Sequence, residues 1–340
     1  MPTRSGRMKR GIIATTAEHQ TAIGYSRPVT GPAAPANLPA ISEIPEPDPD
    51  QVVELKSKVG KIFVERSAHI LTDSLVEHGY WDPQISRLIR MLLRRGMTFV
   101  DAGANIGYFT LLASKIVGRS GRVYAIEPDI KNLAILKANI ERNGAKNVTI
   151  LPMAAWTERT QLYIERPEAE GATTQVSAQK REVERLVEAA RLDETIAGPV
   201  DYLKVDCEST DHVVVNSARG LLESNPKMAV TVEFDPHHDS HTGHSPAQIL
   251  DQYEALGLSP YELSPQGDFI EPSSWERIAT KPMPEGHTCF DFLLARELPE
   301  EARVGREARA KGILERGGDL LEYVPEAIRP PIRDRDRQGG

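Results

Sequence analysis

The sequence predicts a doubly wound α/β fold, in which helices cover both faces of an open, mostly parallel sheet. Short apolar runs that read as strands alternate with amphipathic helical stretches along most of the chain. Several of these strands are apolar at consecutive positions, as expected for strands buried on both faces. A glycine-containing turn, Asp101 to Gly107, follows the first of these strands and leads into a helix, as in folds of this type.

The predicted elements follow one another in strand and helix pairs. The first helix, DPQISRLIRMLLRRG, has apolar residues spaced three and four apart and ends at Gly96. The later elements are a strand MTFVD, a helix over about 106–117, a strand RVYAIEP, a helix over about 133–140, a strand NVTILPMAA, a strand VDYLKVD followed by a helix, a strand KMAVTVEF, a helix over about 249–256 and a strand TCFDFLLAR.

The two ends of the chain differ from this core in composition. Residues 1–47 are rich in Pro, Ala, Thr and Gly without an apolar period, so we expect a flexible N-terminal arm. Residues 297–340 turn charged and close in RPPIRDRDRQGG, which predicts a partly disordered C-terminal extension. The folded domain is therefore predicted to span residues 48–296.

Composition narrows the class of protein and its partners. The 340 residues are 40% hydrophobic and 26% charged, as in an ordinary globular protein. A net charge of -8 gives no general attraction to phosphate backbones, so we expect no nucleic acid partner. We also expect no membrane partner, because no apolar run approaches the roughly 18 residues that span a bilayer. Cys207 and Cys289 fit neither a disulfide framework nor a CxxC motif, which favours a cytoplasmic location; the oligomeric state stays open.

Ligands of such sheets bind beyond the carboxyl ends of the strands, so the turn after the first strand is the first candidate site. Gly103 permits a sharp turn and a close approach to a ligand, and the next helix offers unpaired N–H groups. The carboxylate of Asp101 would repel a pyrophosphate and attract the ammonium of an amino-acid ligand. A dinucleotide fingerprint would need glycines where this chain has Asn105 and Tyr108. The turn therefore indicates an amino-acid-like ligand.

The ends of the second and third strands extend this candidate site. Glu127 and Pro128 end the second strand in AIEPD, and an acidic group there is placed to accept both hydroxyls of a ribose. Ala155, at the end of the third strand, is a candidate wall for an adenine ring, although it reads equally well as a core residue. Together with the preceding turn, Glu127 indicates an adenosyl amino acid as the ligand.

The fourth strand ends in two carboxylates that are candidate catalytic groups. Asp206 and Glu208 follow LKV, and carboxylates in a cleft can position or deprotonate an acceptor. The alternative is that these acids and Lys204 only neutralise one another.

A histidine-rich segment follows the fifth strand. The ordinary histidine pKa near 6.5 suits proton abstraction, so His237 and His238 are candidate general bases. A metal site formed by His237, His241 and His244 is an alternative that Pro236 and Gly243 disfavour, and we expect no metal; a solvated polar loop is the other alternative.

From about Gly79 to Arg296 the chain resembles the FkbM family of methyltransferases. The resemblance rests on DAGANIGYFT with EP on the next strand, and on DYLKVDCESTDHVVVNSARGLLES followed by VTVEF. It implies a Rossmann-like class I methyltransferase sheet with flanking helices, S-adenosyl-L-methionine as the methyl donor, and a hydroxyl on a natural product, sugar or related small molecule as the acceptor. The predicted cofactor-binding residues are Asp101, Gly103, Ala104, Asn105, Tyr108, Glu127, Pro128, Ala155 and Asp206.

Two departures from the family pattern fall on the acceptor side. The family usually reads K-x-D-x-E-G where this chain has Ser209 in place of the glycine, and E-x-H where Asp235 follows Glu233. N- or carboxyl-methylation of a peptide or amino-acid-derived acceptor therefore stays an alternative. A non-catalytic adenosyl-binding scaffold is disfavoured, because charged groups such as Asp101 and Glu127 cost stability unless they are used or paired.

Overall fold

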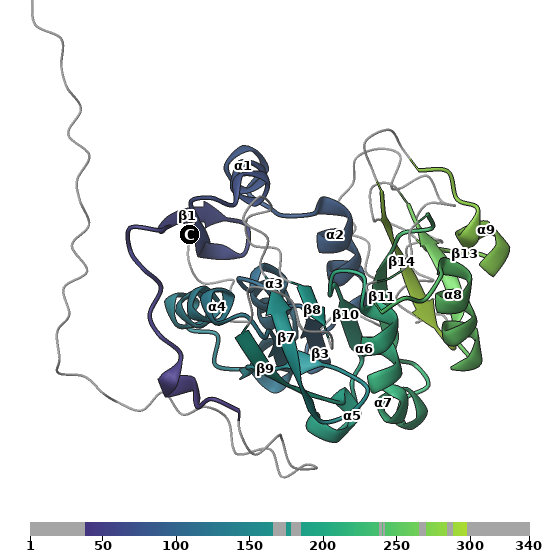
Figure 1. Cartoon of the computed structure of the whole chain (residues 1–340). Coiled ribbons are helices and arrows are strands. Elements are labelled where there is room, and N and C mark those ends of the chain that lie inside the picture. Colours follow the sequence, from purple (N-terminus) through teal and green to yellow (C-terminus); the bar gives the residue numbers. More distant parts are fainter. Residues whose placement is uncertain are drawn as a thin grey trace, which may run out of the picture.

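The computed structural model describes residues 38–165, 175–177, 185–237, 240, 242–264, 270–283 and 288–297 (Figure 1). Its centre is an eight-stranded sheet, accompanied by a four-stranded and a two-stranded sheet. The strands of the central sheet are β3 (Thr98–Ala102), β4 (Arg122–Ile126), β5 (Val148–Leu151), β10 (Tyr202–Val205), β11 (Ala229–Phe234), β12 (Ser259–Leu263), β13 (Ile270–Pro272) and β14 (Phe290–Ala295).

The central sheet is mostly parallel and has the order β13-β12-β14-β11-β10-β3-β4-β5. Pairing is parallel from β5 through β4, β3 and β10 to β11, whereas β14 runs antiparallel between β11 and β12. The chain order reverses between β3 and β10, and a sheet of this kind opens a crevice at the carboxyl ends of the strands that flank such a reversal. The doubly wound sheet predicted from the sequence is confirmed.

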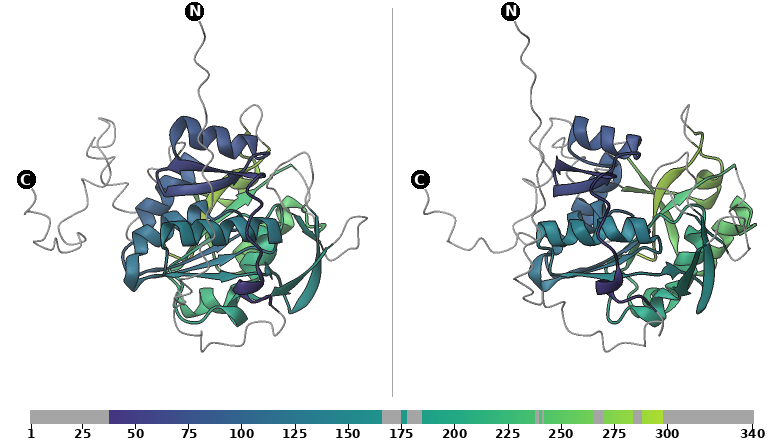
Figure 2. Two further views of the ribbon diagram at one scale, coloured as in Figure 1. Left: turned by 90° about the vertical axis from the view of Figure 1, so that its left-hand side faces the viewer. Right: turned by 60° about the vertical axis from the view of Figure 1, so that its left-hand side comes forward.

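Helices cover both faces of this sheet (Figure 2). One layer consists of α2 (Pro83–Leu92), α3 (Tyr108–Val117) and α4 (Ile130–Asn143). The other consists of α5 (Leu192–Thr195), α6 (Asp211–Ser217), α7 (Arg219–Ser224), α8 (Pro246–Ala255) and α9 (Trp275–Ala279). Strand residues alternate between the two layers, since Phe99 packs in the first and Val100 in the second. Among the helices of the described residues, none is both long and apolar enough to cross a membrane.

Smaller elements flank the central sheet. The hairpin of β1 (Val52–Ser57) and β2 (Gly60–Glu65) precedes α1 (His69–His78) and rests on α4, where the Asn139 amide accepts from the Phe63 N–H at 2.6 Å and donates to its carbonyl at 3.0 Å. The four-stranded sheet has the order β6-β9-β7-β8. Its strands are β6 (Ala154–Ala155), β7 (Thr160–Glu165), β8 (Gln175–Ser177) and β9 (Arg185–Ala190), and two 3-10 turns are η1 (Ile41–Glu43) and η2 (Gly118–Ser120). The hairpin and the four-stranded sheet were not predicted.

The end of the predicted N-terminal arm differs from expectation. Ile44 is 2% exposed and belongs to the apolar core on the α4 side of the sheet. The Lys137 ammonium donates to the Ile44 carbonyl at 3.2 Å and pairs with Glu46 at 2.8 Å. The buried Ile44, with the partly buried Ile41 and Leu38, thus packs this proline-rich stretch against the domain, although its composition shows no apolar period. Residues 1–37 of the predicted arm and residues 298–340 of the predicted extension lie outside the described residues.

Candidate active site

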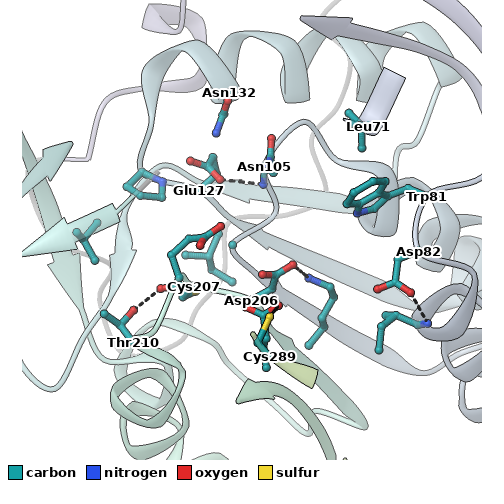
Figure 3. A pocket seen from close by; sticks show the side chains of 18 of the residues that line it. Leu71, Trp81, Asp82, Asn105, Glu127, Asn132, Asp206, Cys207, Thr210 and Cys289 are labelled. Carbon is teal, nitrogen blue, oxygen red and sulfur yellow. Dashed lines mark hydrogen bonds and ion pairs between the residues drawn. The ribbon is translucent and has the colours of Figure 1, made fainter. Parts of the chain in front are cut away.

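A cavity of about 840 Å³ lies at the carboxyl ends of β3, β4, β10 and β11, where the strand order reverses (Figure 3). Its lining also includes residues of α1, the segment between α1 and α2, and β14. The predicted site residues that line it are Gly103, Asn105, Glu127, Pro128, Ala155, Asp206 and Glu208. Three further predicted residues, Asp101, Ala104 and Tyr108, are buried, and none of them belongs to the lining.

The glycine turn brings the ends of β3 and β10 together. Gly103 has a φ of +80°, and a β-carbon there would lie 1.9 Å from the carbonyl oxygen of Asp206. Asn105 follows with a φ of +50°, in the left-handed region. Residue 103 must therefore be glycine for two reasons, the backbone conformation and the lack of space.

Glu127 is a buried carboxylate held by two backbone N–H groups. It is 3% exposed, its Oε2 accepts from Asn105 at 2.8 Å, and its Oε1 accepts from Asp129 at 2.8 Å. Burial raises the pKa of Glu127 to about 7, and the nearby Asp129 adds to the rise, while the N–H bonds oppose it. The carboxylate is therefore oriented and close to its titration point at neutral pH.

An ion pair between the buried Lys204 and the partly exposed Asp206 lies between the two halves of the cavity. The Lys204 ammonium lies 2.9 Å from Asp206 Oδ2 and 4.7 Å from the centre of the Phe109 ring. Asp101 is fully buried and accepts from the Thr110 hydroxyl at 2.6 Å, while its Oδ1 lies 4.0 Å from the Lys204 ammonium. Burial raises the pKa of the Asp101 carboxyl, and the charge of Lys204 opposes this rise. The neutralisation proposed as an alternative role for Lys204 thus occurs with Asp206.

Two oxygens at the turn are buried without a hydrogen-bond donor. They are Asp101 Oδ1 and Asn105 Oδ1, within the part of the chain that the structure describes. A buried acceptor without a donor loses its hydration free energy, and native proteins leave few such groups. Both oxygens belong to the segment that the sequence predicted to contact an amino-acid ligand.

The other half of the cavity is lined by carboxyl groups that the sequence analysis did not propose as site residues. Asp82, Glu233 and Asp291 join Asp206 in this half. Burial raises the pKa of each of the first three, and the neighbouring acids raise it further. Glu233 lies next to the end of one predicted strand, KMAVTVEF, and Asp291 lies within another, TCFDFLLAR. A carboxyl group at either position could have been recognised from the sequence as a candidate site residue.

The wall on the α1 side is apolar. Ile70 and Leu71 of α1 line the cavity together with Trp81, which precedes the N-cap of α2. Ile70 is 78% exposed, which is unusual for a large aliphatic side chain. Leu71 and Trp81 are drawn on the side of the cavity away from Glu127 (Figure 3). The site thus combines an acidic interior with an apolar wall.

Of the two histidine candidates, only His237 is among the described residues. His237 is exposed, it does not line the cavity, and its backbone N–H donates to Asp235 Oδ1 at 2.8 Å. His238 lies outside the described residues. His237 follows the end of β11 by three residues, and a loop residue at this distance can point away from the site because the sheet no longer constrains its backbone.

His244 instead packs against α6. Its Nδ1 lies 3.3 Å from Nε2 of His212 and 2.8 Å from the Thr242 hydroxyl. His241, a member of the metal set considered above, lies outside the described residues, and among those described no group of three or more His, Cys, Asp or Glu residues is arranged to hold a metal. The described end of this loop therefore anchors to a helix.

The turn after β10 keeps a left-handed backbone without glycine. Glu208 has a φ of +48° and Ser209 a φ of +66°. Ser209, where the family pattern has glycine, thus takes a left-handed conformation that a glycine would adopt with less strain.

A doubly wound sheet with a glycine turn after β3 and a carboxylate at the end of β4 defines a Rossmann-like α/β protein of the class I methyltransferase type. Residues 101–258 match the model of the methyltransferase FkbM domain, so the chain contains a domain of this family. The family implies S-adenosyl-L-methionine as its cofactor.

Curated relatives match over shorter stretches. A probable cobalt-precorrin-6B C(15)-methyltransferase (decarboxylating) from Saccharolobus solfataricus is 32% identical over 87 residues, which cover 24% of this chain and 44% of the relative. A protein-L-isoaspartate O-methyltransferase from Methanococcoides burtonii is 34% identical over 61 residues, which cover 17% of this chain and 29% of that protein. The chain thus spans less than half the length of either relative.

Solved structures with a similar fold are distant in sequence. The crystal structure of the methyltransferase FkbM from Methylobacillus flagellatus aligns with a TM-score of 0.39 and 17% identity, over 60% of this chain and 45% of that one. A SAM-dependent methyltransferase from Aquifex aeolicus aligns with a TM-score of 0.39 and 16% identity, over 68% of this chain and 97% of the other.

Proposed function

We propose that this protein transfers a methyl group from S-adenosyl-L-methionine to a hydroxyl of a natural-product, sugar or related small-molecule acceptor. The observation that carries this proposal is the cavity itself. It joins a site suited to an adenosyl amino acid, around Glu127 and the glycine turn, to an acidic half around Asp206, Glu233 and Asp291. We assign the first half to the cofactor and the second to the acceptor.

The cofactor half fits S-adenosyl-L-methionine in its donors and acceptors. Glu127 is fixed by two N–H groups and faces the cavity, where its carboxylate can accept ribose hydroxyls. The unpaired oxygen of Asn105, which lines the cavity, is an acceptor for the N–H groups of an amino-acid ligand. Pro128 and Ala155 offer apolar surface for the adenine ring. When bound, the cofactor supplies a methyl group on a positively charged sulfur.

The chain's own residues supply positioning and proton transfer. Lys204 holds Asp206 in one orientation at the boundary between the two halves. The carboxyl groups of the acidic half can accept the proton of an acceptor hydroxyl. Their raised pKa values make their ionised forms stronger bases than a carboxylate with an ordinary pKa. Ile70, Leu71 and Trp81 provide an apolar wall for the body of the acceptor and exclude water.

A second candidate is methyl transfer to an amine or peptide-derived nitrogen. Lys204 is the single cationic side chain among the described residues that line the cavity, and it is paired with Asp206. The remaining carboxylates would attract a protonated amine. The choice between oxygen and nitrogen therefore depends on which acceptor group reaches these carboxylates.

Transfer of radiolabelled methyl from S-adenosyl-L-methionine tests the proposal. Catechol, methyl α-glucoside, phenethylamine and phenylacetate represent phenol, sugar, amine and carboxylate acceptors, and calorimetry with S-adenosyl-L-homocysteine measures cofactor binding separately. We expect binding, with label in catechol or the glucoside. Label in phenethylamine or phenylacetate would select nitrogen or carboxyl methylation instead. Binding with no label in any acceptor would favour a non-catalytic scaffold, and no binding would contradict the cofactor assignment.

A further inference from the structure

Two acidic residues of the cavity face each other across a strand pair. Glu233 of β11 and Asp291 of β14 are directly opposite in the antiparallel ladder. Directly opposite residues point to the same face of a sheet, with their β-carbons about 4.5–5.5 Å apart. The next pair, Val232 and Phe292, belongs to the apolar layer on the other face. Both acids therefore project together into the cavity, which both of them line.

This carboxyl pair has no cation of its own. The Lys204 ammonium is 2.9 Å from Asp206 and 4.0 Å from Asp101. Glu233 Oε1 accepts from the Cys289 thiol at 2.9 Å, whereas the Asp291 carboxyl has no hydrogen bond or ion pair within the described residues. The titratable groups that surround the pair are Asp82, which caps α2, Tyr202 and Lys204 of β10, Asp206, which follows β10, Asp211 of α6, and Cys289.

Two partly buried carboxylates at this separation cannot both ionise without an electrostatic penalty. Burial raises the pKa of Asp291 and of Glu233, and the other acids raise both further, while Lys204 opposes them. A pair in this situation retains one proton after the first has been lost. Burial, which disfavours the charged form, makes the ionised carboxyl of this pair a stronger base than a carboxylate exposed to water.

We propose that Glu233 and Asp291 hold one proton between them and act as the general base of the methyl transfer. This inference rests on the function proposed above. A lone pair of the acceptor oxygen forms the bond to the methyl carbon, the electrons of the carbon–sulfur bond move to sulfur, and the hydroxyl proton moves to the ionised carboxyl group. The pair takes this role in a chain that has Asp235 where the family has a histidine.

Unfolding of the unliganded protein tests the shared proton without cofactor or acceptor. Raised pKa values mean that the folded protein binds more protons than the unfolded chain, so the pair lowers stability as pH rises. Asp291→Asn and Glu233→Gln each remove the repulsion. We expect each to raise Tm at pH 8 by about 2–4 °C and to make the fall of Tm between pH 5 and 8 shallower.

The double variant and two controls sharpen this measurement. Because each single variant removes the same repulsion, the double variant should gain less than the sum of the two. Asp206→Asn breaks the ion pair with Lys204 and should lower Tm, whereas Glu223→Gln, exposed on α7, should leave it unchanged. A lower Tm in both single variants at pH 8, an unchanged pH dependence, or additive gains would overturn the shared proton.

Turnover with the acceptor labelled in the radiochemical assay tests the catalytic role. Each single variant should lose about 10²–10⁴-fold in kcat. Affinity for S-adenosyl-L-homocysteine should stay nearly unchanged in both variants. Full turnover in both variants would overturn the role as base. If the wild type labels no acceptor, the proposed function and the catalytic role fail together, while the unfolding result still decides the shared proton.

Discussion

The carbonyl oxygen of Asp206 lies 1.9 Å from the place where a β-carbon on Gly103 would be. This contact joins the ends of β3 and β10, the two strands between which the sheet reverses its order. It also sets the distance between the turn after β3 and the Lys204–Asp206 pair. The close approach of these two strand ends at the cavity therefore depends on the absence of a side chain at Gly103.

Gly103→Ala should destabilise the protein and abolish measurable binding of S-adenosyl-L-homocysteine. The substitution combines left-handed strain, roughly 1–2 kcal/mol, with a clash against backbone that cannot move freely. Gly144→Ala is the matched control, because its φ is +61° and nothing lies within 4 Å of an added β-carbon. Thermal unfolding and calorimetry should show a larger loss at 103 than at 144. Equal losses would show that the contact with Asp206 relaxes easily.

Glu127→Ala should weaken the binding of S-adenosyl-L-homocysteine by about 10- to 150-fold, which corresponds to charge-assisted hydrogen bonds worth about 1.5–3 kcal/mol. The affinity is measured by calorimetry at pH 8, where the carboxyl is mostly ionised. Glu223→Gln, on the exposed side of α7, serves as the control. An unchanged affinity in Glu127→Ala would remove Glu127 from the cofactor site.

The same carboxyl group predicts how affinity depends on pH. Its pKa is raised to about 7 in the unliganded protein, chiefly by burial. The ionised form accepts ribose hydroxyls best, so affinity should fall as pH drops through about 7 towards 5. Glu127→Gln does not titrate and should show a flatter profile over this range. A wild-type profile as flat as that of the variant would contradict the assignment.

Ser209→Gly should stabilise the protein by up to about 1 kcal/mol. The exposed Ser209 has a φ of +66°, and glycine relieves this strain although it makes the unfolded chain more flexible. Ser224→Gly, within the right-handed helix α7, should instead lose stability. Urea unfolding at constant pH compares the two. If Ser209→Gly instead lowers the free energy of unfolding, the serine side chain stabilises the protein by more than the strain of its left-handed backbone destabilises it.

The His212 side chain should make the protein sensitive to acid. Burial, together with the adjacent His244, lowers the pKa of His212 to about 4. The neutral ring therefore contributes stability that is present above about pH 6.5 and is lost as pH falls towards 4, by up to about 3 kcal/mol. The free energy of unfolding of His212→Gln should change less over this range. His237→Ala, at an exposed position, is the control, and an equal acid response in His212→Gln would show that other groups dominate it.

Several residues that line the cavity could be predicted because their signals are local. Apolar runs indicated β3 and β4, and parallel strands place their carboxyl ends at one edge, so Gly103 and Glu127 could be assigned to a common site. Asp206 followed from the same reasoning. Tyr108, the first residue of α3, is buried in the core and does not line the cavity.

The sequence by itself therefore determined the succession of strands and helices along the chain and the residues at which the parallel strands end. Hydrophobic period and turn chemistry, which indicate both, are properties of neighbouring residues. Only the tertiary structure decided that Asp291 lies opposite Glu233, since β14 inserts antiparallel beside β11 and the register depends on pairing between distant segments. It also decided that His244 packs against His212 on α6. No local pattern encodes these contacts, because their free energy arises only once the sheet and helices have assembled.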